Sequence, residues 1–169
     1  MASSYQELNL LYVPAIGADR SASYARVYEA NRHHVYSLAF WMTDNEMTAE
    51  QIAAAAFVRA FAAAAEPTAE MIDRALLAEV RELMPVGELT LACDAAAEIV
   101  NVRKNVKRVH LERAVVELPA TERLLFLMHD VESYDKVRIA RLLGLSEDEV
   151  LQGLHQARLR MRELIAAQQ

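Results

Sequence analysis

The sequence of 169 residues has one cysteine, four glycines, four prolines and no long apolar run. A single cysteine, Cys93, cannot form a disulfide within the chain, which fits a reducing compartment. No apolar stretch approaches the ~20 residues that a membrane-spanning helix needs. The first residues also lack the basic and then apolar pattern of a secretory signal. We therefore expect a cytoplasmic protein that makes no use of a membrane.

The chain also lacks an excess of positive charge, since its formal net charge is −6 at pH 7. Proteins that bind nucleic acid usually neutralise phosphates with a basic surface, and release of counterions supplies much of the affinity. Because the chain is acidic overall, we do not expect it to bind DNA through its whole surface. A local basic patch would still suffice for it.

What the sequence does contain favours helices. Apolar residues make up 54% of the chain, which is ample for a packed core. Alanine and leucine are abundant, and both cost little in a helical backbone, whereas the scarce glycines and prolines interrupt it. Apolar residues recur three and four apart, as on one face of a helix. This spacing predicts an all-α protein with helices over 23–43, 48–65, 68–84, 109–118, 121–131 and 135–143, and a last one opening at residue 146.

The breaks between these helices predict two helical domains on a linker. We expect an N-terminal arm over 1–22, interrupted by Pro14 and Gly17, a first domain over 23–84, a linker over 85–108 with room for one short helix, and a second domain over 109–167. The apolar periodicity also predicts a separate core in each domain. The first would be built around Val35, Leu38, Phe57 and Phe61, and the second around Phe126, Ile139, Val150 and Leu154.

Residues 135–167 have the pattern of a helix-turn-helix. Asp135 is a suitable N-cap for a short helix, which Gly144 would end as a C-cap glycine. Ser146 and Glu149 then form a capping box that opens the last helix. Helix pairs joined through glycine also occur in ordinary bundles, so this pattern alone leaves DNA binding and simple packing open.

Several longer runs resemble the extracytoplasmic-function (ECF) sigma factors, the smallest relatives of sigma-70. Residues 117–123 (ELPATER) and 126–132 (FLMHDVE), with 139–140, 143–145 and 154–158, resemble sigma region 4. Residues 31–39 (NRHHVYSLA) and 56–61 (AFVRAF) resemble region 2. The resemblance covers 24–61 and 116–165 and implies an all-α fold with a region 2-like domain and a region 4-like helix-turn-helix domain.

The resemblance also implies a function and its partners. The chain would be a sigma-factor-like regulator of bacterial transcription initiation that binds core RNA polymerase and promoter DNA, and an anti-sigma or other protein could hold it idle. The DNA contacts it implies are Lys136, Arg138, Gln152, His155, Gln156, Arg158 and Arg162. The polymerase or partner contacts expected in the region 2-like part are Glu50, Gln51 and Arg59. The densest basic cluster of the chain, which consists of Arg103, Lys104, Lys107 and Arg108, is a further candidate for a contact with polymerase, a polyanion or an acidic partner.

Three departures from the family pattern leave an alternative open. Glu147, Asp148 and Glu149 place three acids at the start of the recognition helix, where DNA phosphates would have to come. Alanines at 54 and 55 replace polar residues of the polymerase-binding helix. No aromatic residue lies between Phe61 and Phe126, although strand separation uses aromatic stacking. The alternative is a sigma-derived protein-interaction module, a decoy or adaptor, that has lost promoter binding.

The histidines and the cysteine give little reason to expect an enzyme. His33 and His34 are adjacent, so on a helix they point about 100° apart and would share a metal ion poorly. His129 and Asp130 could serve acid–base chemistry, but a surface pair is the simpler interpretation. Cys93 has no neighbouring cation in sequence to activate it. We expect no catalytic site, no metal and no cofactor.

Overall fold

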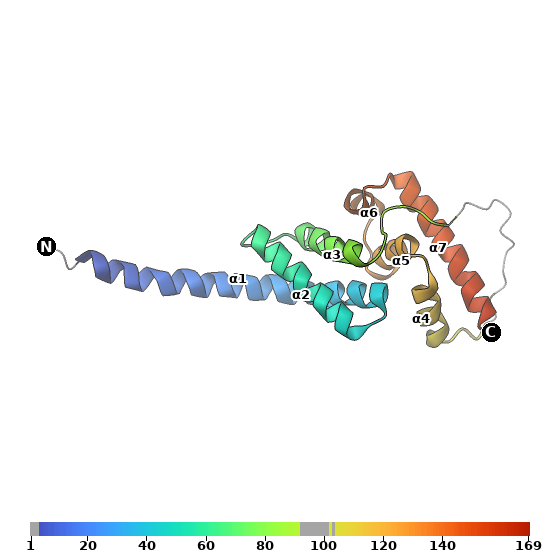
Figure 1. Cartoon of the computed structure of the whole chain (residues 1–169), viewed down its shortest axis with the longest axis horizontal. Coiled ribbons are helices and arrows are strands. Elements are labelled where there is room, and N and C mark those ends of the chain that lie inside the picture. The colour runs from blue at the N-terminus through green and yellow to red at the C-terminus, as the bar shows by residue number, and fades with distance from the viewer. Residues whose placement is uncertain (1–3, 92–101, 103) are drawn as a thin grey trace.

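The computed structural model describes residues 4–91, 102 and 104–169, and side chains from residue 19 onward. These residues form seven α-helices and one π-helical turn, and they contain no strand (Figure 1). The elements are α1 (Ser4–Thr43), α2 (Glu46–Ala63), α3 (Ala69–Leu83), α4 (Arg108–Glu117), α5 (Ala120–Phe126), the π-helical turn η1 (Leu127–Val131), α6 (Lys136–Leu143) and α7 (Glu147–Ala167). The prediction of an all-α fold is confirmed.

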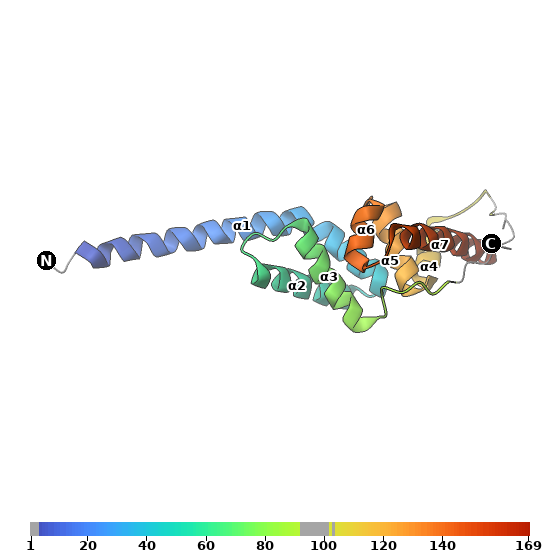
Figure 2. The same ribbon diagram turned by 90° about the horizontal axis from the view of Figure 1, so that it is seen from above.

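The N-terminal block consists of α1, α2 and α3. In contrast to the expected start near residue 23, α1 begins at Ser4 and continues through Pro14 and Gly17, so its first half extends away from the other helices (Figures 1 and 2). Asn45 caps α2, because its side chain accepts a hydrogen bond from the Thr48 amide at 2.9 Å. The helix predicted to begin at residue 48 therefore begins two residues earlier, at Glu46.

The C-terminal block consists of α4 to α7 and contains the predicted helix-turn-helix. Asp135 caps α6 by accepting a hydrogen bond from the Arg138 amide at 2.8 Å. Gly144 ends α6 with φ +73°, a left-handed conformation that glycine adopts without strain. Ser146 and Glu149 form the capping box that opens α7. These three local predictions are confirmed.

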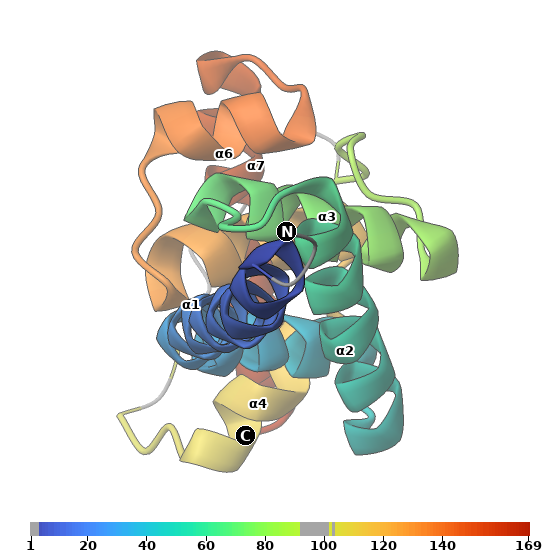
Figure 3. The same cartoon turned by 90° about the vertical axis from the view of Figure 1, so that its left-hand side faces the viewer.

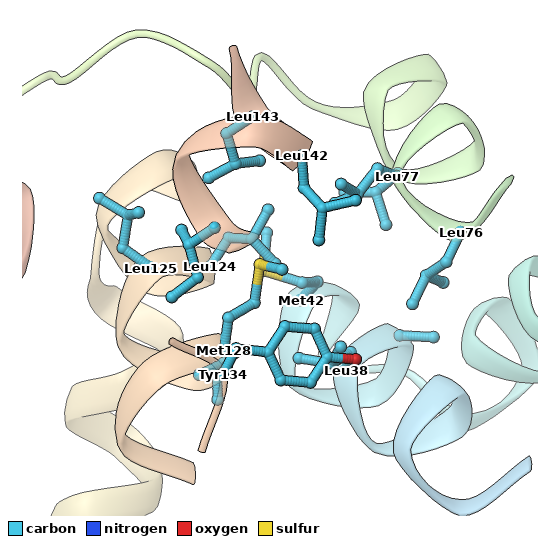
Figure 4. Close-up of a cluster of buried hydrophobic side chains, with 14 of the residues drawn as sticks. Leu38, Met42, Leu76, Leu77, Leu124, Leu125, Met128, Tyr134, Leu142 and Leu143 are labelled. Carbon is cyan, nitrogen blue, oxygen red and sulfur yellow. The ribbon is translucent and has the colours of Figure 1, made fainter. Parts of the chain in front are cut away.

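The two blocks share one core, so the prediction of two separate cores is wrong. Leu38 and Met42 of α1 pack in the same buried cluster as residues of α3, α5, η1 and α6 (Figure 4). Phe61 and Phe126, expected at the two centres, are only partly buried at its margin. A helical period shows which face of a helix is buried, but it does not show that one face serves two blocks.

The segment after α3 lies along the C-terminal block. The Gly87 amide donates to the Thr121 hydroxyl at 3.2 Å, and Leu89 packs against the core. The amides of Thr90 and Leu91 both donate to Glu122 Oε1 at 2.6 Å. We call residues 86–91 the strap. Residues 85–91, 102 and 104–107 of the linker contain no helix. The short helix considered for the linker would therefore lie within 92–101, outside the described part of the chain.

Candidate nucleic-acid interface

The helix-turn-helix exposes some of the predicted DNA contacts and buries others. Gln152, His155, Arg158 and Arg162 lie on the exposed surface of α7, and Lys136 is half-buried at the start of α6. Gln156, in contrast, is only 7% exposed. A side chain buried to this degree has no open path to a base edge in the arrangement seen here.

The N-terminus of α7 is acidic and exposed. Glu147, Asp148 and Glu149 are all solvent-facing. Glu149 Oε2 accepts hydrogen bonds from the Ser146 amide at 2.7 Å and the Ser146 hydroxyl at 2.8 Å, and these bonds lower the pKa of Glu149. The acids stabilise the helix through its dipole. They also make this end of α7 unfavourable for phosphate.

Arg138 of α6 is bound to an aspartate of the other block. Asp73 of α3 is only 2% exposed, accepts a hydrogen bond from the Tyr134 hydroxyl at 2.8 Å, and accepts another from the Arg138 guanidinium. The guanidinium carbon of Arg138 also lies 4.0 Å from the centre of the Tyr134 ring. His34 of α1 completes the cluster, with Nε2 3.5 Å from Asp73 Oδ1.

The electrostatics of this cluster favour the charged pair. Burial acts to lower the pKa of Arg138, but its hydrogen bond and attraction to Asp73 raise that pKa overall. Burial, followed by the charge of Asp73, raises the pKa of Tyr134 well above its usual value. Tyr134 therefore remains a hydrogen-bond donor, and Arg138 remains a cation, across the physiological pH range.

Two further contacts hold α6 to α3. Arg141 pairs with Glu70 at 2.9 Å, and Arg81 donates to the backbone carbonyl of Leu143 at 3.4 Å. Viewed along α1, α3 lies between α1 and α6 (Figure 3). Of the three basic residues on α6, the two arginines are thus paired with carboxylates of α3, and the third is Lys136.

Arg158 of α7 is also engaged within its own block. Its guanidinium donates two hydrogen bonds to Asp130, at 2.8 and 2.6 Å. These bonds raise the pKa of Arg158, and the bond from Arg158 is the main reason that the pKa of Asp130 is lowered. His129 Nδ1 lies 2.7 Å from Asp130 Oδ1. The pair considered for acid–base chemistry therefore belongs to an ion-pair cluster that ties η1 to α7.

The predicted polymerase or partner contacts lie on separate surfaces. Glu50 lines a hollow of about 450 Å³ between α1 and α2, together with aromatic residues. Gln51 is exposed, and Arg59 pairs with Glu79 at 2.7 Å. Three residues of the basic cluster, Lys104, Lys107 and Arg108, are exposed, and the fourth, Arg103, lies outside the described residues.

The described residues offer neither a metal site nor a membrane span. No group of three or more histidine, cysteine and acidic side chains is placed to hold a metal ion there. No helix of that part is long and apolar enough to cross a membrane.

Sequence reasoning did not single out the residues that join the blocks. The sequence pattern around Asp73 is typical of an exposed acid on an amphipathic helix, and the pattern around Tyr134 is typical of a turn. Their position beside α6 depends on contacts between segments 61 residues apart. One signal was available in Glu122, which precedes Leu125 and Phe126 by three and four residues and so shares their helical face; it proves to be fully buried under the strap.

Comparison with known families agrees with this geometry. Residues 108–161 match the family model described as Sigma-70, region 4. The match spans α4 to most of α7, and it identifies the C-terminal block as a sigma-70 region 4 domain with a helix-turn-helix. A search of curated proteins found no match to the chain. The region 4 match supports a sigma-factor-like role in transcription.

Proposed function

We propose that the protein is an ECF-type, sigma-factor-like regulator of transcription initiation that works in the cytoplasm by binding core RNA polymerase and promoter DNA. The match to sigma-70 region 4 over a well-formed helix-turn-helix carries this proposal. The two helices and their glycine turn have the connection that places a second helix in the major groove.

The exposed face of α7 is the DNA surface in this proposal. Gln152 and His155 can donate or accept hydrogen bonds at base edges, and Arg162 can reach phosphate. Arg158 can contribute only if it leaves Asp130. The hollow between α1 and α2 and the cluster Lys104, Lys107 and Arg108 are two separate surfaces for polymerase or an anti-sigma protein.

A reconstituted system tests the proposal. Core polymerase should co-purify with the full chain, and the mixture should start transcripts at a subset of promoter fragments. Replacing Gln152 and His155 with alanine should reduce these transcripts at least tenfold while polymerase still co-purifies. Arg160→Ala is the matched control on the same helix, because Arg160 pairs with Glu163 at 2.8 Å.

The opposite result identifies the alternative function. If the native chain gives no promoter-dependent transcript and retains a different protein in place of polymerase, it is an interaction module that has lost promoter binding. The acids at the start of α7 are the feature that this alternative would explain.

A further inference from the structure

We propose that an apolar hollow beside Trp41 is a binding site for a small anionic amphiphile, a molecule with a short hydrocarbon chain and a carboxylate at one end. The hollow has a volume of about 260 Å³ and is lined by side chains of α1, α4, α5, η1 and α7. This inference goes beyond the proposed function and does not depend on it.

The hollow has a buried floor and an open mouth. Its lining includes Val115, Leu127 and Met161, which are all buried. It also includes Leu111 of α4 and Val131 of η1, which are 44% and 50% exposed. Because buried and exposed side chains line the same hollow, a ligand can enter it from solvent without unfolding the helices around it.

The lining suits hydrocarbon better than water. Seven of the nine lining residues are apolar, and the two polar ones are Arg108 and Glu112. A well-held water needs about two to four polar partners, which such a surface supplies poorly. An alkyl chain instead gives the lining dispersion contacts and leaves water itself. The volume of 260 Å³ fits a chain of about eight carbons, if each carbon takes roughly the 30 Å³ that a water molecule occupies in the liquid.

The charges at the mouth favour a carboxylate. Arg108 donates a hydrogen bond from Nε to Glu112 at 2.5 Å, which leaves the two terminal nitrogens of its guanidinium for a second carboxylate. The Arg108 side chain is 87% exposed, so it lies at the mouth and not at the floor. Lys107 directly precedes it, and Lys104 is exposed as well. This stretch is therefore basic, although the chain as a whole has a net charge of −6.

A titration of the native full chain with straight-chain carboxylates, from hexanoate to dodecanoate, tests the site. Isothermal titration calorimetry measures affinity and stoichiometry. The fluorescence of Trp41, the one tryptophan of the chain, reports contact with the lining of the hollow. Octanol is the uncharged probe of the same length as octanoate.

Two variants separate the charge from the cavity. Arg108→Ala removes the cation at the mouth, and Arg113→Ala, at another exposed arginine of α4, is its control. Val131→Phe puts a ring in the mouth without touching the buried floor. Its control is Val137→Phe, the same change at a valine of α6 that is 54% exposed and does not line the hollow.

We expect one ligand per chain and an affinity that rises about fourfold with each added methylene. The rise should level off near about eight carbons, when the hollow is filled. Octanoate should bind about threefold more tightly than octanol, as expected for an exposed ion pair, and Arg108→Ala should abolish that difference. Val131→Phe should weaken the binding of both probes about tenfold, because the ring displaces part of the chain. The two control variants should bind like the native chain.

Three results would overturn the proposal. The first is no saturable binding at millimolar octanoate. The second is an affinity that keeps rising through dodecanoate with several ligands per chain, which is the pattern of adsorption on scattered apolar side chains. The third is binding of octanol as tight as that of octanoate. Equal weakening by Val131→Phe and Val137→Phe would also refute the site, because only the first change lies in the hollow.

Discussion

At the scale of single residues, Gly153 shows how packing can reverse an expectation from helix propensity. Glycine inside a helix normally weakens it by roughly 1 kcal/mol relative to alanine. In α7, however, a Cβ at position 153 would lie 2.4 Å from Leu125 Cδ1 and 2.7 Å from Leu89 Cδ2. Leu125 is fully buried and cannot move aside freely. The glycine therefore lets α5 and the strap approach α7.

We predict that Gly153→Ala destabilises the protein by about 1 kcal/mol, because overpacking of about 1–3 kcal/mol exceeds the gain in helix propensity. Urea unfolding measures the change. Adding Leu89→Ala should restore part of the loss by removing one of the two clashes. Gln152→Ala, at the exposed neighbouring position, should be nearly neutral. A Gly153→Ala protein more stable than the native one would show that α5 and the strap can shift.

Local residue patterns predicted the site only in part. Asp135, Gly144 and Ser146 act as predicted, because capping depends on residues three or four apart in the chain. The pairing of Arg138 with Asp73 spans 65 residues, and no local pattern encodes it. The exposed positions of Gln152 and His155 follow from the period of α7, whereas the burial of Gln156 depends on neighbours from other elements.

At the scale of elements, the start of α7 depends on one carboxylate more than on its neighbours. The hydrogen bonds from the Ser146 amide and hydroxyl hold the folded-state pKa of Glu149 below its unfolded value. A depressed carboxyl pKa contributes stability above the unfolded pKa of about 4.3, and this stability is lost as the pH falls through the folded pKa. The capping box should therefore weaken in acid.

We predict that Glu149→Ala destabilises the protein at pH 7 and that its difference from the native protein shrinks as the pH falls below about 4. Denaturant unfolding from pH 7 to pH 3 measures this difference. Asp148→Ala, which changes an exposed acid of the same helical turn, is the control and should show a smaller effect at pH 7. An unchanged Glu149→Ala difference across this range would contradict the role of the charged carboxylate.

The strap is the second element whose position depends on a single acid. Glu122 is fully buried, and its Oε1 accepts both the Thr90 and the Leu91 amide. We predict that Glu122→Ala raises hydrogen exchange of these two amides at least tenfold, because they lose their acceptor. Amide exchange followed by NMR measures it. Glu88→Ala, an exposed acid of the same segment, should leave both amides protected, and equal exchange in the two variants would contradict the anchoring.

At the scale of the whole molecule, the two blocks are joined through the end of α1. Arg123 of α5 donates to the carbonyl of Met42 at 2.8 Å, and it also donates to carbonyls at the end of α4. Trp41 lines an apolar hollow of about 260 Å³ together with Leu111, Phe126 and Met161 of the C-terminal block. The helices follow from the sequence, but this shared surface does not, because a helical period does not identify the partner of a buried face.

The shared core predicts that the native protein unfolds in a single transition. Trp41, the one tryptophan of the chain, lies at the contact between the blocks, so its fluorescence reports their separation. Far-UV circular dichroism reports the helices of both blocks. Because Leu38, Met42 and Leu76 pack with Leu124 and residues of α6, separating the blocks exposes core side chains and destabilises each of them. We expect the two probes to give the same midpoint in urea. With Asp73→Ala, both midpoints should move to lower urea together, because Tyr134 and Arg138 lose their partner while the shared core still couples the blocks. Two transitions in the native protein would instead mean that the shared core adds little to the stability of either block.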